Sequence, residues 1–73
     1  MAQHTFTVVI EQDEDSVFLA TCPALQGCYT QGDTYEEALA NIREAIELHL
    51  QARRDLGEQI PQEVGTATLT VTV

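Results

Sequence analysis

The segment from Thr34 to Gly57 carries the signals of one long amphipathic helix, and this helix limits the folds available to so short a chain. Thr34 and Glu37 form the T-x-x-E pattern of a capping box, with Asp33 as a competing cap, and Gly57 is a natural stop. These signals predict a helix over residues 35–56. Its apolar side chains recur at helical spacing and form one stripe that must pack against another element: Tyr35, Ala38, Leu39, Ile42, Ala45, Ile46 and Leu50.

Four other stretches have the composition of β-strands: residues 5–11, 17–22, 27–31 and 66–73. The polar residues 12–16 between the first two predict a hairpin, and Pro23 stops the second strand because it has no N–H. A right-handed crossover through the helix would place the last strand beside the first and parallel to it. We therefore predict an α+β fold of order β-β-β-α-β, with a four-stranded mixed sheet of strand order 3-2-1-4 and the helix on one face.

The last stretch, TATLTVTV, shows the cleanest alternation in the chain. Apolar side chains occupy one face and threonines, among them Thr68, Thr70 and Thr72, occupy the other. An outer strand with no charge presents unpaired backbone groups, which need pairing or protection. We therefore expect Thr68, Thr70 and Thr72 to mark an oligomer edge, and the protein to form a homo-oligomer, a dimer or higher.

A corner of the chain, TCPALQGCYTQGDT, joins the second strand to the third and then enters the helix. Gly27 and Gly32 would permit backbone angles that side chains forbid. Cys22 and Cys28 flank the loop and leave three alternatives: packing as small buried hydrophobes, a disulfide, or zinc ligation. Their spacing is wider than the C-x-x-C of structural zinc and no histidine lies nearby, so packing is the preferred interpretation.

Charge narrows the class of partner. The chain has 73 residues and a formal net charge of −9, from 12 acids against 3 basic residues. Such a charge repels phosphate backbones, which argues against direct nucleic-acid binding, and it favours either a basic protein partner or solubility alone. The sequence contains neither a membrane-span pattern nor a signal-peptide pattern, so we expect one domain, 1–73, with no membrane association and a cytoplasmic location.

The corner and its surroundings resemble a known family. Ala20, Cys22, Pro23, Leu25, Gly27 and Cys28 match the pattern A-x-C-P-x-L-x-G-C, which follows an acidic hairpin. The next motif, G-D-T-x-E-E-A-L, covers Gly32 to Leu39, and Ile60 and Pro61 also stand where the family often has them. Together these residues resemble the N-terminal domain of HicB antitoxins. The hairpin differs in having Asp15-Ser16 where the family often has Asp-Gly.

The resemblance implies a partial ribonuclease-H-like fold and a function in a type II toxin-antitoxin system. That function is to bind and neutralise a small basic toxin, HicA, which cleaves messenger RNA. Family members often carry a C-terminal DNA-binding domain, and we expect none here because the sequence ends at Val73. The alternative is a stand-alone HicB-like oligomeric domain that has no toxin partner and another protein-binding role.

A ribonuclease-H-like fold also raises the hypothesis of a metal-dependent nuclease, which holds its metals with carboxylates, one of them inside the first strand. Here the first strand has no interior acid, since Glu11 lies at its end. We therefore expect no enzyme activity and no catalytic, cofactor-binding or metal-binding residues. The hairpin acids Asp13, Glu14 and Asp15 are instead our candidates for attracting a partner, because they are dense in a chain with few basic residues.

Overall fold

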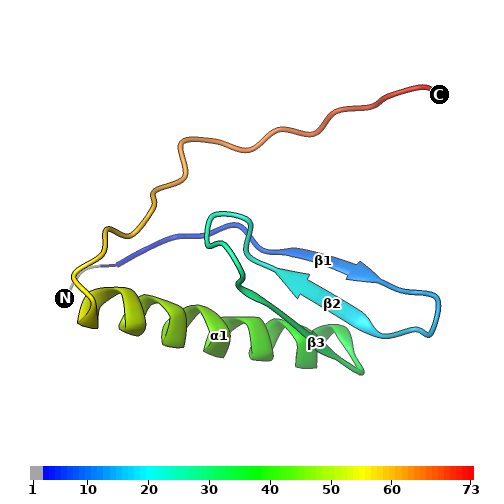
Figure 1. The fold of residues 1–73 in the computed structure, drawn as a ribbon. Coiled ribbons are helices and arrows are strands. Elements are labelled where there is room, and N and C mark those ends of the chain that lie inside the picture. The colour runs from blue at the N-terminus through cyan, green and yellow to red at the C-terminus, as the bar shows by residue number, and fades with distance from the viewer. Residues whose placement is uncertain (1–2) are drawn as a thin grey trace.

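The computed structural model describes residues 3–73 and shows a three-stranded antiparallel sheet with one helix across one face (Figure 1). The strands are β1 (Val9–Gln12), β2 (Phe18–Thr21) and β3 (Tyr29–Gly32), in the order β1-β2-β3, and the helix is α1 (Tyr35–Asp55). The sequence identified all three strands, but it began the first strand four residues and the third strand two residues too close to the N-terminus. The predicted helix ends one residue later than the observed one, at the C-cap Leu56.

The register of the sheet separates two faces. Ala20 pairs with Ile10 on one side and Thr30 on the other, and this row lies under the helix, where Ala20 is fully buried. The neighbouring rows point away from the helix because successive side chains alternate across a sheet. They form what we call the open face, made by six residues: Val9, Glu11, Leu19, Thr21, Tyr29 and Gln31.

The helix begins at the predicted cap. Thr34 has extended backbone angles, and its hydroxyl accepts a hydrogen bond from the Glu37 N–H at 3.0 Å. The Glu37 carboxylate reaches back and accepts the N–H of Asp33 at 3.1 Å, so Asp33 is held by the cap and does not itself cap the helix. Acids in the first turn and arginines in the last turn both match the helix dipole.

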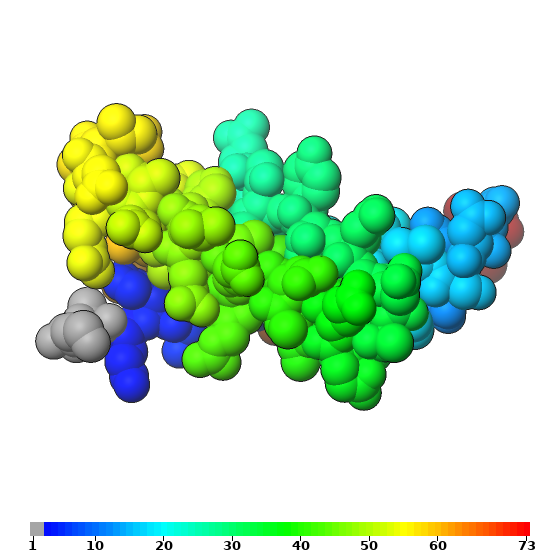
Figure 2. Space-filling model, turned by 90° about the horizontal axis from the view of Figure 1, so that it is seen from below, coloured from blue at the N-terminus to red at the C-terminus, as the bar shows by residue number. Residues whose placement is uncertain are grey.

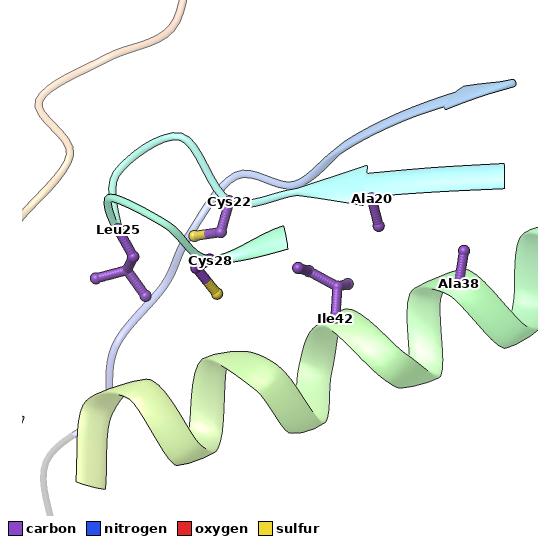
Figure 3. Packing of buried hydrophobic residues seen from close by; sticks show 6 residues of the cluster. All are labelled: Ala20, Cys22, Leu25, Cys28, Ala38 and Ile42. Atoms are coloured by element: carbon purple, nitrogen blue, oxygen red, sulfur yellow. The ribbon is translucent and has the colours of Figure 1, made fainter. Parts of the chain in front are cut away.

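The core lies between the helix and the sheet and is small (Figure 3). The side chains of Ala38 and Ile42 point from the helix toward Ala20 and the two cysteines on the sheet side. Around them pack half-buried side chains from both layers and from the segment before β1, including Phe6 and Val8. The fully enclosed core is limited to six residues: Ala20, Cys22, Leu25, Cys28, Ala38 and Ile42.

Gly32 ends β3 at the point where the helix comes closest to the sheet. A Cβ built on Gly32 would lie 2.5 Å from the backbone nitrogen of Ala38 and 2.9 Å from the carbonyl carbon of Glu37. The expectation that Gly32 supplies an unusual backbone angle is therefore wrong, since its requirement is space beside the helix. Gly27 does have a positive φ, +81°, as expected.

The fourth strand is the main departure from the prediction. Residues 66–73 are extended but pair with no strand, so the four-stranded sheet and the 3-2-1-4 order are not formed in this structure. The physical reason is that alternation specifies which side chains share a face but not which edge a strand will join. The segment runs over the helix-free side of the sheet without joining it (Figure 1). The partial ribonuclease-H-like description therefore stays a prediction.

The chain between the helix and this segment is tied back to the start of the sheet. Arg53 donates to the carbonyl of Gln59 at 3.0 Å, and Glu63 accepts both the N–H and the hydroxyl of Thr7, the latter at 2.6 Å. The pairing of β1 with β2 begins at Val9, so Thr7 lies outside the ladder and its N–H has no strand partner. The Glu63 carboxylate accepts this N–H in place of a strand carbonyl.

Substitution of Gly32 tests the close approach of helix and sheet. Gly32→Ala forces a methyl group against the helix backbone, and we expect the free energy of unfolding to fall by about 1–3 kcal/mol, the usual cost of overpacking. Gly65→Ala is the matched control, because a Cβ there meets nothing within 4 Å. Urea denaturation measures both variants, and equal stability of the two proteins would contradict the packing argument.

The contact between Glu63 and Thr7 makes a pH dependence testable. Two hydrogen bonds from Thr7 lower the pKa of the Glu63 carboxyl from its ordinary 4.5, and the bond from the Thr7 hydroxyl has a larger effect than the bond from its N–H. The contact therefore contributes its full stabilisation at pH values above the ordinary pKa. This stabilisation is lost as the pH falls through the lowered pKa of the folded protein. In an NMR titration the Thr7 amide should report a midpoint below 4.5, and Glu63→Gln should remove that transition. A midpoint at or above the ordinary value would count against the contact.

Candidate partner-binding site

The tip of the β1–β2 hairpin is organised by one carboxylate. The Asp13 side chain accepts the backbone N–H groups of Asp15 and Val17, each at 2.9 Å. The backbone closes the turn with two more bonds, from the Asp13 N–H to the Val17 carbonyl at 2.9 Å and from the Ser16 N–H to the Asp13 carbonyl at 3.1 Å. Asp13 is exposed, yet its carboxylate is committed to holding the turn.

Ser16 occupies a strained position in the same turn. Its φ is +66°, and it is the one non-glycine residue with positive φ in the described part of the chain. This is the left-handed region in which a side chain is disfavoured and glycine is not. Ser16 thus occupies a backbone conformation that a glycine at this position would adopt without strain.

The carboxylates of the other two hairpin acids are not used to hold the turn. Glu14 and Asp15 are exposed, and their carboxylates make no hydrogen bond or ion pair among residues 3–73. The hairpin projects beyond the first turn of the helix, as seen from the helix side (Figure 2). Since β1 and β3 run parallel, the helix start lies at the same end and adds the acids of its first turn, Glu36 and Glu37. We call this end, residues 13–15 with residues 33–37, the acidic end.

The basic residues lie elsewhere. No Lys or Arg occurs before Arg43, so seven of the twelve acids, from Glu11 to Glu37, precede the first basic side chain. Arg43 forms an exposed pair with Glu47 at 3.7 Å, which contributes little stability.

Arg53 donates to His49 Nδ1 at 3.4 Å, which leaves His49 Nε2 to donate to the Gln26 carbonyl at 3.1 Å. This His49–Arg53 chain, not foreseen from the sequence, links the corner loop to the segment after the helix.

The two cysteines pack in the core. Both are free thiols and both are buried, with exposed fractions of 0% for Cys22 and 4% for Cys28. The Cys22 N–H donates to the Cys28 carbonyl at 3.0 Å, and burial raises the pKa of each thiol. Figure 3 shows the two sulfur atoms pointing in different directions. The preferred interpretation as small buried hydrophobes is confirmed, and the corner contributes both cysteine side chains to the core.

The open face of the sheet is a second exposed surface. Its side chains include Val9, which is 42% exposed, and Tyr29, which is 73% exposed, with half-buried Leu19 and Thr21 between them. Glu11 is its only charged residue. The sequence contained no signal that Tyr29 would be exposed on this face.

The structure does not bring the predicted site residues together. Asp13, Glu14 and Asp15 form the hairpin tip, whereas Thr68, Thr70 and Thr72 lie in the unpaired final segment, where all three are exposed. Within residues 3–73 no group of three His, Cys, Asp or Glu side chains is arranged to hold a metal ion. None of the helical segments searched over the same residues is long and apolar enough to cross a membrane.

Comparison with known proteins places this architecture. Residues 6–71 match the family described as the HicB-like antitoxin of bacterial toxin-antitoxin systems. The chain belongs to this family. A crystal structure of the N-terminal domain of the Burkholderia pseudomallei antitoxin HicB superimposes with a TM-score of 0.73 at 33% identity, covering 84% of this chain and 72% of that one.

Curated relatives of the HicB-like chain include small proteins from archaea and bacteria. A UPF0150 protein of Thermoplasma acidophilum is 45% identical over 58 residues, covering 80% of this chain and 84% of the relative. A UPF0150 protein of Synechocystis is 43% identical over 60 residues, with 82% and 76% coverage. These matches confirm the resemblance inferred from the hairpin, the cysteine corner and the capping motif.

Truncation of the hairpin acids separates the structural carboxylate from the free ones. Asp13→Ala removes the acceptor for two backbone N–H groups, and we expect it to lower the free energy of unfolding by about 1–2 kcal/mol. Glu14→Ala removes an equal charge without a hydrogen bond and should change it by less than about 0.5 kcal/mol. Thermal unfolding followed by circular dichroism measures both, and equal effects would show that Asp13 has no special role in the turn.

Proposed function

We propose that this protein is the antitoxin module of a type II toxin-antitoxin system and neutralises a HicA-like, mRNA-cleaving toxin by binding it. The observation that carries this proposal is the family match over residues 6–71, supported by the structural likeness to an antitoxin domain. The module acts by protein–protein contact in the cytoplasm, without catalysis, without a cofactor and without direct binding to nucleic acid.

Electrostatics supports the choice of a basic partner. A toxin that binds RNA presents positive charge to phosphates, and a chain of net charge −9 presents the same sign of charge as RNA to that surface. Seven of the twelve acids precede the first basic residue in the chain, and the topology collects several of these seven at the acidic end. Complementary fields of this kind raise association rates by roughly 10- to 1,000-fold at low ionic strength.

The hairpin acids have two different roles at this surface. Asp13 fixes the turn, and Glu14 and Asp15 present their carboxylates to the toxin. We further propose that the module is a homo-oligomer, a dimer or higher, whose contact involves the segment that contains Thr68, Thr70 and Thr72. The two surfaces lie on different elements, so toxin binding and self-association are compatible.

Charge reversal at the tip tests the contact without disturbing the turn. In Glu14→Lys/Asp15→Lys, Asp13 is retained, and we expect toxin association at low salt to slow by about tenfold, with a weaker dependence on salt. The control Glu44→Lys/Glu58→Lys makes the same change in net charge away from the acidic end and should slow association less. Stopped-flow measurements at two salt concentrations decide between them, and equal slowing by both variants would remove the hairpin from the contact.

Co-expression tests the function itself. The partner gene is expected beside this one, as a short reading frame for a basic, lysine-rich protein. Expression of that protein alone should arrest growth, and co-expression with the present chain should restore it. Growth arrest that persists with both proteins present would reject the antitoxin function and favour the alternative, a HicB-like oligomeric domain with another protein-binding role.

A further inference from the structure

The isolated chain exposes more surface than a domain of its size normally does. Its accessible surface is 6147 Å², roughly 1,600 Å² more than the ~4,500 Å² expected for a compact protein of 8.1 kDa. Its radius of gyration of 13.9 Å also exceeds the ~11 Å expected for 73 residues. The excess is about twice the ~800 Å² that each partner buries in a standard-size protein interface.

The exposed apolar side chains of the final segment contribute to this excess. Leu69, Val71 and Val73 are 85%, 80% and 121% exposed, and Val64 is 104% exposed. Residues 64–73 contain no charged side chain, although the chain as a whole is strongly acidic. The family match runs to residue 71, so most of this apolar, alternating segment lies within the part of the chain that matches the family. A strand-like segment with no partner is the feature that the monomer leaves unexplained.

One edge of the sheet has unpaired backbone groups that a further strand could pair with. The Asp13 N–H bonds to Val17 across the hairpin, so by alternation the N–H and C=O groups of Ile10 and Gln12 point to the outer edge of β1. β1 is at the end of the strand order, and no strand among residues 3–73 pairs with this edge. The other edge is protected, because the Asn41 side chain donates to the outward carbonyl of Gln31 on β3 at 2.9 Å.

The start of the final segment directs it away from its own sheet. Glu63 is held by Thr7 just before β1, and from there the chain departs over the helix-free side (Figure 1). Ten extended residues at about 3.3 Å each would reach roughly 33 Å, comparable with the 29 Å second dimension of the whole molecule. The segment is therefore long enough to reach the β1 edge of a neighbouring molecule.

We propose that two copies of this chain exchange their final segments, so that residues 66–73 of each copy pair with the outer edge of β1 in the other. Every copy has one free segment and one free edge, so reciprocal exchange satisfies both within a closed two-fold dimer. The segment is neutral and Glu11 is the one charge on the adjoining open face, so the contact brings few carboxylates together. The fourth strand predicted from the sequence is then supplied by the partner copy.

This proposal specifies the self-association that forms part of the proposed function. Its first test uses the full chain with Ala67→Pro/Thr68→Pro, which removes two successive N–H groups, one of which must face the paired strand. Thr68→Ala is the matched control because it removes the same side chain and keeps both N–H groups. Sedimentation equilibrium should give a dimer of about 16 kDa for wild type and control, and an at least tenfold weaker dimer for the proline variant.

Two results would overturn the exchange. One is a wild-type protein that sediments at 8.1 kDa at micromolar concentration, and the other is a proline variant that dimerises as tightly as Thr68→Ala. Circular dichroism controls for folding, and because the segment lies outside the core, the helix signal should be equal in all three proteins. Loss of helix signal in the proline variant alone would also contradict the proposal, since it would place the segment within the monomer fold.

A mixed sample distinguishes exchange from pairing within one molecule. In a dimer of isotope-labelled and unlabelled copies, isotope-filtered NMR should detect contacts between residues 66–73 of one copy and Ile10 or Gln12 of the other. Contacts confined to a single copy would overturn the proposal. The co-expression experiment with the neighbouring toxin tests the antitoxin function independently of the dimer. If the wild-type protein is monomeric but restores growth, only the exchange is rejected. If it is dimeric but does not restore growth, only the toxin binding is rejected.

Discussion

The fold depends on the close contact between one helix and one face of a three-stranded sheet. Ala20, Gly32 and Ala38 are all small, and they let the helix backbone approach the sheet until Gly32 has no room for a Cβ. That approach encloses the six-residue core, which includes both cysteines. Because a single helix covers a single face, the contact that stabilises the domain also leaves the opposite face exposed.

The same topology decides where the charged residues collect. β1 and β3 run in the same direction, so the hairpin after β1 and the helix start after β3 lie at one end of the molecule. The first turn of the helix favours acids because of the helix dipole, and the hairpin turn uses a carboxylate to satisfy its N–H groups. Local structural requirements thus place several carboxylates together, and the surface that results suits a basic partner.

Local features could be predicted from the sequence, whereas features that depend on long-range contact could not. The cap at Thr34, the helix and the hairpin follow from residues within a few positions of one another. The family, too, could be recognised from short motifs. The role of Gly32 was misassigned because a steric requirement beside Ala38 is visible only when helix and strand are packed. Asp13 seemed equivalent to Glu14 and Asp15 because the chain order does not show which carboxylate closes the turn.

The fourth strand shows the same limit most clearly. Alternation in residues 66–73 specifies a strand with one apolar face, but strand pairing is a relation between two segments, and only one of them is defined by this pattern. In a single chain the apolar side chains remain exposed and the β1 edge remains unpaired. The proposed association through this segment would rest on backbone pairing and apolar burial, which salt does not screen, whereas the proposed attraction at the acidic end would weaken with salt. If both proposals hold, ionic strength acts on the two surfaces separately, and we expect self-association to persist under salt conditions that slow the binding of a basic partner.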